Sequence, residues 1–487
     1  MSDPSLSNAE APKIKLFEKA RKIYPKDITG LFRRLKWLVM AALLAIYYFT
    51  PFIRFDRGPH IPSQAILIDM EGRRAYFFMF EIWSQEVYYF AGLLILAALF
   101  LFFATSLFGR VWCGYACPQT VWTDLFVKVE HFIQGDHVAR ERLDKGPLTF
   151  NKIWRKLVTH MLWIVIGALT GGAWTLYFTD APTLIDQIIH MSVPWQTQIW
   201  IYGLTFSTYI MAGYAREQVC TYMCPYARFQ SGMFDRDTMI ISYDKERGEP
   251  RGSHKKGDSW DNRGACVDCN ACVQVCPVGI DIRDGLQYQC IACGLCVDAC
   301  NTIMDKVGLP GNLVRYDTAN NQEQRSACKS KGVPYKEKNH FLRPRTFYYV
   351  IVMSIVAGIM LFSLLNRPPF SLNILHERNP LFVKLSDGSV RNSYKIHILN
   401  HTGIDQTFAL SVEGIEPKSL KILAASELEP NNLGVLADSV GEFRVTLVAD
   451  LPAKEARRDI TFVIRSSVSD SIAATKTMFI EGDGHDR

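Results

Sequence analysis

Eight cysteines in the middle of the chain form two groups with one repeated spacing. Each group reads Cys-x2-Cys-x2-Cys-x3-Cys, and the groups are Cys266, Cys269, Cys272 and Cys276, then Cys290, Cys293, Cys296 and Cys300. In runs of this spacing, three thiolates bind one iron–sulfur cubane and the fourth cysteine binds the neighbouring one. We therefore predict two [4Fe–4S] clusters, one on Cys266, Cys269, Cys272 and Cys300 and one on Cys290, Cys293, Cys296 and Cys276. Paired zinc sites are the alternative, but zinc rarely needs this spacing twice over.

The two runs differ in the residue directly after the last cysteine. It is Pro277 in the first run and Asn301 in the second, so we expect the local turns to differ. Thirteen residues separate Cys276 from Cys290, which leaves room for little more than a tight loop or a short helical turn. Apolar side chains around the runs should exclude water from the sulfur atoms and help to set the potential. Such a module carries electrons, but its sequence does not say in which direction.

A second set of cysteines occurs in two copies of Cys-x3-Cys-Pro. The first copy is Cys113 and Cys117 and the second is Cys220 and Cys224; an arginine, Arg110 or Arg216, precedes each copy. Each copy follows a long apolar stretch, so the sequence contains an internal repeat of two hairpins. On a helix, cysteines at i and i+4 share a face, and the proline disfavours helical backbone at the second cysteine. We expect each pair to lie where a membrane span ends.

Four thiols at such a place favour a soft metal. Thiolate selects Cu(I), zinc or an iron–sulfur centre, and stabilising Cu(I) makes bound copper easier to reduce. We predict a metal site, which is also the reaction site, on Cys113, Cys117, Cys220 and Cys224; the residues alone leave copper, zinc and an iron–sulfur centre open. Two alternatives stay open: a third cluster on the same thiols, or four buried cysteines that only pack. Met223 is either a soft neighbour of the metal or a packing residue.

Five stretches of about 17 to 22 residues carry almost no charge and are long enough to cross a hydrocarbon core of about 30 Å. Buried core helices are the alternative, most seriously for the first stretch, which contains Pro51. The predicted spans are Trp37–Ile53, Val87–Phe108, Leu157–Phe178, Gln198–Ala215 and Thr346–Leu365.

Basic residues in the flanking segments predict the orientation of these spans, because Lys and Arg are retained on the cytoplasmic side. Nine of them lie in residues 13–36 and eight in residues 109–156, whereas the segment between the third and fourth spans has none. The N-terminus and residues 109–156 and 216–345 are therefore predicted inside, and the chain after the fifth span outside. All thirteen cysteines lie between Cys113 and Cys328, on the predicted inner side, which favours metal or redox chemistry over disulfides. The first span is predicted to be an uncleaved anchor.

The composition agrees with a multi-domain membrane protein. Hydrophobic residues make up 48% of 487 residues and charged residues 21%, which excludes a disordered chain. The net charge of +6 gives no argument for nucleic-acid binding. We predict five parts: a basic tail (1–36), a four-span α-helical membrane bundle (37–230), a cytoplasmic ferredoxin-like module with a linker (231–345), a fifth span (346–366) and an outer antiparallel β-sandwich (367–487).

The outer domain shows alternating apolar and polar residues in segments such as Tyr394–Ile398, Glu442–Val448 and Ile460–Ile464. Its histidines, His376, His397 and His401, are more often structural than metal ligands in such a setting. Elsewhere, His160 has no evident axial partner for a haem, and Cys328 stands alone in a charged linker as a free thiol.

The order of these motifs resembles the CcoG family, also called FixG or RdxA, over nearly the full chain. The resemblance rests on Arg110–Pro118, Arg216–Pro225 and Cys266–Cys300. It implies a multi-pass protein of the bacterial cytoplasmic membrane with cytoplasmic clusters and a periplasmic immunoglobulin-like domain. It also implies a cupric reductase that makes Cu(I) for assembly of cbb-type cytochrome c oxidase. A copper chaperone or transporter and oxidase subunits would be its partners.

Two other functions stay open. The chain could be a membrane electron-transfer subunit linked to a quinol or a flavoprotein, with no role for copper. It could also be a non-catalytic scaffold that binds copper or oxidase subunits. No flavin or nicotinamide fingerprint is visible, so we expect the cytoplasmic reductant to be another protein.

Overall fold

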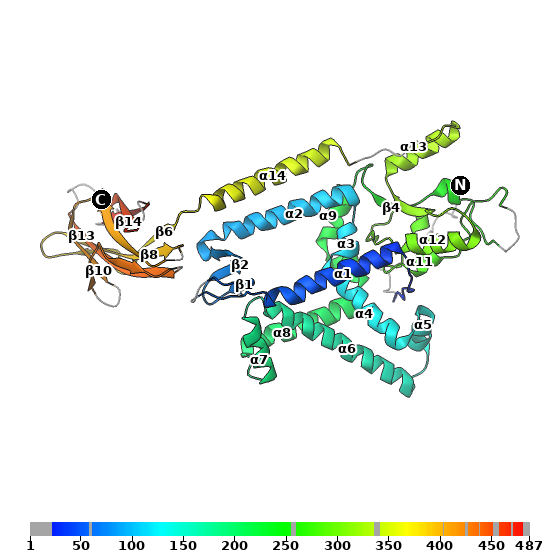
Figure 1. The fold of residues 1–487 in the computed structure, drawn as a ribbon, viewed down its shortest axis with the longest axis horizontal. Helices are drawn as coiled ribbons and strands as arrows, with labels where there is room; N and C mark the ends of the chain where they lie inside the picture. The colour runs from blue at the N-terminus through cyan, green and yellow to red at the C-terminus, as the bar shows by residue number, and fades with distance from the viewer. Residues whose placement is uncertain are drawn as a thin grey trace, which may run out of the picture. The chain divides into compact units, whose positions relative to one another are not determined.

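A computed structural model gives the fold of the chain as two compact units, residues 1–358 and 359–487 (Figure 1). The structure describes residues 22–57, 61–254, 260–335, 341–402, 404–423, 427–437, 439–450, 457–468 and 471–480.

Four helices in the described residues are long and apolar enough to cross a membrane. They are α1 (Leu31–Phe49), α2 (Tyr88–Phe108), α6 (Phe150–Thr175) and α14 (Pro344–Leu365). These helices coincide with the first, second, third and fifth predicted spans. Helices α1 and α6 begin six and seven residues before the predicted spans, because their basic first turns are helical too. The helices mark the chain as a membrane protein; which side each end faces stays a prediction.

The predicted fourth span has a different form from the one expected. It is made of α8 (Trp195–Thr208), 14 residues long, followed by a π-helical segment, Tyr209–Ala215. At the end of this segment, the amide of Arg216 donates a hydrogen bond of 2.8 Å to the carbonyl of Met211, five residues earlier, as in a π-helix. A single regular α-helix was therefore the wrong expectation, and a crossing by this segment stays a prediction.

Small residues set the packing of α8 on α6 (Figure 1). A Cβ atom at Gly171 would lie 2.7 Å from the carbonyl oxygen of Ile201, and one at Gly167 would lie 3.0 Å from that of Thr205. Gly167 and Gly171 form a Gly-x3-Gly pair, which lets two helix backbones approach closely. Helix α4 (Pro118–Gln134) packs against both α6 and the π-helical segment.

The first unit also contains a small sheet and the ferredoxin-like part. A three-stranded sheet of β1 (Ile66–Asp69), β2 (Arg74–Phe77) and β3 (Phe80–Trp83), which the sequence did not indicate, lies between α1 and α2 in the chain. The ferredoxin-like part contains the antiparallel pair β4 (Ile240–Tyr243) and β5 (Val314–Asp317) with helices α11 (Ala271–Gln274) and α12 (Leu295–Val307). The other helices are α3 (Val111–Tyr115), α5 (His137–Lys145), α7 (Ala181–Ile189), α9 (Pro225–Met233), α10 (Lys245–Gly248) and α13 (Ala319–Ser330).

The second unit is a β-sandwich. One sheet has the order β11-β10-β13-β8-β6, with β7 also paired to β8, and the other has the order β12-β9-β14-β15. Tyr394, Phe408 and Phe462 are fully buried in one core between the sheets. The strands are β6 (Phe370–His376), β7 (Val383–Lys384), β8 (Val390–Asn400), β9 (Gln406–Glu413), β10 (Pro417–Leu423), β11 (Glu427–Leu428), β12 (Leu433–Val435), β13 (Ser439–Ala449), β14 (Arg457–Ser466) and β15 (Ile472–Ile480).

The three segments predicted as strands in this unit lie in β8, β13 and β14, which confirms that prediction. Its histidines have structural partners: the Nε2 atom of His376 lies 2.7 Å from Oδ1 of Asn392, and His401 lies beside Arg367 and Ser371. The interpretation of these histidines as structural therefore agrees with the contacts.

Candidate iron–sulfur and thiol site

The four cysteines predicted to bind one cluster line a first cavity in the ferredoxin-like part. Cys266, Cys269 and Cys272 line it together with Cys300 from α12, and its volume is about 360 Å³. Tyr243, Met304 and Val314 complete an apolar wall. Cys269 is exposed, so this cavity lies close to solvent.

A second cavity of about 340 Å³ gathers the other set. Cys290, Cys293 and Cys296 line it together with Cys276. Cys272 lines both cavities, so they are neighbours. The fourth cysteine of each run thus lies in the cavity of the other run, the crossed arrangement that the spacing predicts.

The same backbone conformation occurs around the second cysteine of each run. Asp268 and Asn270 flank Cys269 with φ of +53° and +55°, and Ala292 and Gly294 flank Cys293 with φ of +52° and +76°. Left-handed residues between right-handed ones turn successive N–H groups into a concave surface that favours negative charge. The same local geometry therefore suits both runs to an anionic cluster.

The chemistry of the thiols fits bound iron. Burial raises the pKa of Cys272 and Cys290 to about 11 and that of Cys276 and Cys300 to about 12. Thiolate in such a place needs a compensating cation, which cluster iron supplies. In the described part of the chain, no three His, Cys, Asp or Glu side chains are arranged to hold a single metal ion. Eight thiols in two neighbouring apolar cavities have the donor chemistry that two cubanes need.

The two Cys-x3-Cys-Pro copies come together at the ends of the membrane helices. Cys113 lies in α3 and Cys220 in a second π-helical segment, Val219–Met223; Cys117 and Cys224 directly precede α4 and α9. Each proline thus begins a new helix, where its missing N–H costs nothing. For the second copy, the expectation of an α-helical i, i+4 pair is wrong because the backbone there is π-helical.

The four thiols are close enough to affect each other's ionisation. Burial raises the pKa of Cys113 to about 11, with added repulsion from Cys117 and Cys224. Burial also raises the pKa of Cys220 to about 12, with added repulsion from the other three cysteines. The guanidinium of Arg110 opposes the shift at Cys113. The structure therefore brings all four predicted thiols near one another, while the binding of a metal by them stays a prediction.

The first copy packs directly on the loop of the second cluster cavity. The hydroxyl of Tyr115 donates to the carbonyl of Cys293 at 3.0 Å, and Nη1 of Arg110 donates to the carbonyl of Cys290 at 3.2 Å. A Cβ atom at Gly114 would lie 2.7 Å from the carbonyl oxygen of Ile291, so a glycine is needed there. Cys113 shares one buried apolar cluster with Cys293 and Ile291.

A buried amide that the sequence did not single out connects this contact to the membrane helices. Gln230, fully buried in α9, accepts from Nε of Arg110 at 3.0 Å and from the thiol of Cys113 at 3.2 Å. Its own amide nitrogen reaches Oγ1 of Thr105 at 3.4 Å. An isolated glutamine carries no recognisable sequence signal, so only the fold reveals this role.

The arginine of the second copy forms an ion pair instead of contacting the cluster loop. Arg216 donates to Glu130 at 2.7 and 3.3 Å, and Arg140 donates to the same carboxylate at 3.2 Å. Burial alone would raise the pKa of Glu130, but the two guanidinium groups hold it below its ordinary value. This buried triad ties α4 to α5 and to the residues before Cys220.

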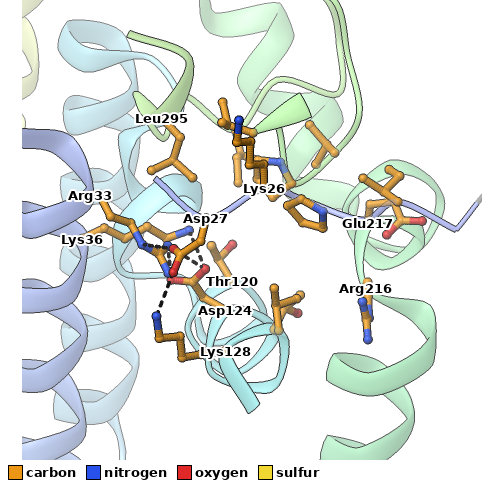
Figure 2. Close-up of a pocket in the computed structure, with 18 of the residues that line it drawn as sticks. Lys26, Asp27, Arg33, Lys36, Thr120, Asp124, Lys128, Arg216, Glu217 and Leu295 are labelled. Carbon is orange, nitrogen blue, oxygen red and sulfur yellow. Dashed lines mark hydrogen bonds and ion pairs between the residues drawn. The ribbon is translucent and has the colours of Figure 1, made fainter. Parts of the chain in front are cut away.

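A shallow pocket beside the ferredoxin-like part has one thiol of the set in its wall (Figure 2). Its wall includes Cys220 and also Val278 and Ile291, which line the second cluster cavity. Ion pairs between Asp27 and Lys128 and between Arg33 and Asp124, both at 2.9 Å, occupy one side, and Arg216 and Glu217 lie on the other (Figure 2). The pocket gives a solute a path to one thiol of the set.

Sequence comparisons agree with this architecture. Residues 215–319 match a family described as "4Fe-4S dicluster domain", residues 90–135 match "4Fe-4S binding domain", and residues 360–481 match "IG-like fold at C-terminal of FixG". The second match includes Cys113 and Cys117, and the first includes Cys220, Cys224 and all eight ferredoxin cysteines.

Full-length relatives are similar over nearly the whole chain. The nitrogen fixation protein FixG of Rhizobium meliloti is 45% identical, covering 91% of this chain and 89% of its own. Protein RdxA of Cereibacter sphaeroides is 44% identical, covering 89% and 90%, and protein RdxB of the same organism is 43% identical, covering 91% and 92%. A crystal structure of a FixG-related protein from Vibrio parahaemolyticus covers 23% of this chain and 96% of its own at 22% identity, with a TM-score of 0.20.

The fold and the matched domains define an iron–sulfur membrane protein with a C-terminal immunoglobulin-like domain. Within that class, the identities show that the chain belongs to the FixG/RdxA/RdxB family.

Proposed function

We infer that this protein passes electrons through its clusters to the four membrane-edge thiols, where Cu(II) is reduced to Cu(I). The product would supply copper for assembly of a cbb-type cytochrome c oxidase, through a copper chaperone or transporter. Each turnover takes one electron from a reduced cluster and adds it to one Cu(II). Thiolate sulfur favours the reduced ion, so the site lowers the free energy of the product.

The observation that carries this proposal is the direct contact between the first thiol copy and the second cluster cavity. Tyr115 and Arg110 bind the carbonyls of Cys293 and Cys290, and Cys113 packs in one buried cluster with that loop. The first cavity, with exposed Cys269, is the one closest to solvent. A soluble donor would therefore reduce the first cluster, and the electron would reach the thiols through the second.

A copper assay tests the proposal. The purified full-length protein is reduced anaerobically and offered Cu(II) with an excess of a Cu(I)-specific chelator. We expect reduction beyond cluster stoichiometry when electrons are resupplied. Cys113→Ser and Cys220→Ser should each lower the rate by about tenfold or more, an increase of about 1.4 kcal/mol in the barrier. The signals of the reduced clusters in electron paramagnetic resonance (EPR) spectra should persist in both variants.

Cys328→Ser is the matched control, because Cys328 lies in α13, away from both cysteine sets. Normal copper reduction in the Cys113 and Cys220 variants would show that these thiols are not the site.

A third cluster on the same thiols is the second candidate, favoured by the 4Fe-4S family match over residues 90–135, which includes Cys113 and Cys117. It would make the chain an electron-transfer subunit without a copper role. Metal analysis after anaerobic purification separates the two. Two cubanes predict about eight iron atoms per chain, whereas a third predicts about twelve. Cys113→Ser should then remove about four iron atoms, and it should remove none if the thiols bind copper.

A further inference from the structure

A second large cavity lies beside the thiols and is not used by the function proposed above. Its volume is about 420 Å³, and it is open to solvent and lined by α4, α6, the end of the π-helical segment and the N-terminal residues Lys22 and Ile23. Glu217 and Gln218 also line it, and Cys220 follows them within one helical turn. Glu217 also lines the pocket of Figure 2, so the cavity lies beside the thiol site.

One end of the cavity is aromatic. Nδ1 of His160 lies 3.0 Å from the hydroxyl of Tyr209, which lies 3.2 Å from the hydroxyl of Tyr214. The rings of His160 and Tyr214 are inclined by only 13°, with their centroids 6.0 Å apart. Trp163 forms the floor and is held in place by its indole N–H, which donates to the carbonyl of Phe126 at 3.2 Å. π-Helical turns often occur at functional sites, and this one positions Tyr209 and Tyr214.

The two ends of the cavity differ in polarity. Tyr214, at the aromatic end, is 59% exposed. The other end contains Lys22, Lys156, Gln134 and the buried Glu130. Such a site suits a flat ring with polar oxygen atoms and an apolar tail that reaches into lipid.

We propose that this cavity binds a lipid-soluble quinol, which supplies electrons to the thiol site from the membrane side. The proposal rests on the copper function proposed above. His160 and Tyr214 hydrogen-bond the ring oxygens, and Trp163 packs against the ring. Both O–H bonds of the quinol break, its ring is oxidised to the quinone, and two Cu(II) ions are reduced to two Cu(I). The two protons leave through His160 toward the polar end.

The neighbouring clusters can hold the second electron that each quinol releases. A quinol releases two electrons, whereas each Cu(II) accepts one. One electron reduces the bound copper, and the other passes to the second cluster until the next Cu(II) arrives. The soluble donor at the first cluster and the quinol would thus be two separate sources of electrons for one site.

Photolabelling tests binding without relying on turnover. The full-length protein in lipid nanodiscs is exposed to an azido-ubiquinone analogue, and labelled peptides are identified by mass spectrometry. We expect saturable labelling within residues 156–163 or 209–218, displaced by decyl-ubiquinone. His160→Ala should reduce that labelling by about five- to tenfold, as expected for the loss of one hydrogen bond in a buried setting. Tyr214→Phe, which removes only a hydroxyl, should reduce it less.

His190→Ala is the matched control, because its side chain is exposed at the end of α7 and paired only with Asp186. Copper reduction driven by decyl-ubiquinol should fall in His160→Ala, while reduction by protein whose clusters were first reduced with dithionite and then separated from the excess dithionite should not. Labelling outside the cavity, labelling displaced equally by phospholipid, or unchanged quinol-driven rates in His160→Ala would overturn the proposal. If pre-reduced clusters, freed of excess dithionite, reduce no copper in the unaltered protein but the labelling result holds, the copper function fails and the quinone site stands.

Discussion

The two Cys-x3-Cys-Pro copies match in their cysteines, proline and preceding arginine but are used differently. In the first copy, Cys113, Gly114 and Tyr115 are buried against the cluster loop. Their counterparts Cys220, Thr221 and Tyr222 lie in a π-helical turn, and Tyr222 is 51% exposed. Arg110 binds the cluster loop, whereas Arg216 binds Glu130. The repeat thus keeps its four thiols together while one copy contacts the loop of the second cluster cavity and the other faces the pockets.

The largest expected effect is the loss of thermal stability when Arg216, the arginine of the second copy, is replaced. Arg216→Met leaves Glu130 with one partner in a site where the carboxylate side chain is 2% exposed. Breaking a buried ion pair from one side typically costs about 3–5 kcal/mol. We therefore expect a large loss of thermal stability, measured by the unfolding of the detergent-solubilised protein. The double variant Arg216→Met with Glu130→Gln should recover part of it, because no unpaired charge remains. Equal stability of the two variants would contradict this account.

Titration of the same carboxylate should have a smaller effect. The pKa of Glu130 is below its ordinary value of 4.5 in the folded chain. Its contribution to stability is therefore present above pH 4.5 and is lost as the pH falls through the lower, folded pKa. The midpoint of thermal unfolding should drop more steeply below pH 4.5 in the unaltered protein than in Glu130→Gln. Parallel curves would show that this ion pair does not contribute to the acid sensitivity.

The contact between the first copy and the cluster loop can be loosened by one methyl group. Gly114→Ala would place a carbon atom 2.7 Å from the carbonyl of Ile291, and overpacking of this kind costs about 1–3 kcal/mol. We expect faster hydrogen exchange at residues 291–293 and slower oxidation of the reduced clusters by Cu(II). Gly203→Ala is the control, because a Cβ atom there meets nothing within 4 Å. Unchanged exchange in Gly114→Ala would mean that the loop does not depend on this contact.

These examples show what the sequence could and could not predict. The 2-2-3 spacing indicated which cysteines gather in each cavity, because three of each set come from one local run and the fourth from the other run; which of them bind iron stays a prediction. The lengths of α2 and α14 followed from unbroken apolar runs. The π-helical turns, the buried Gln230 and the need for a glycine at position 114 depend on contacts between residues far apart in the chain. No spacing within one segment encodes such contacts.

The smallest expected effect is the difference in stability between variants of two tyrosines at equivalent positions in the two copies. Tyr115→Phe removes one hydroxyl, which donates to the carbonyl of Cys293 at 3.0 Å, and should cost about 0.5–1.5 kcal/mol. Tyr222→Phe removes the same atom from the exposed counterpart and should cost almost nothing. Thermal unfolding of both variants, with the EPR signal of the second cluster as a local probe, measures the difference. If both substitutions had the same effect, the hydroxyl of Tyr115 would not hold the first copy on the cluster loop, and the asymmetry between the copies would have to come from Arg110 and Gly114 alone.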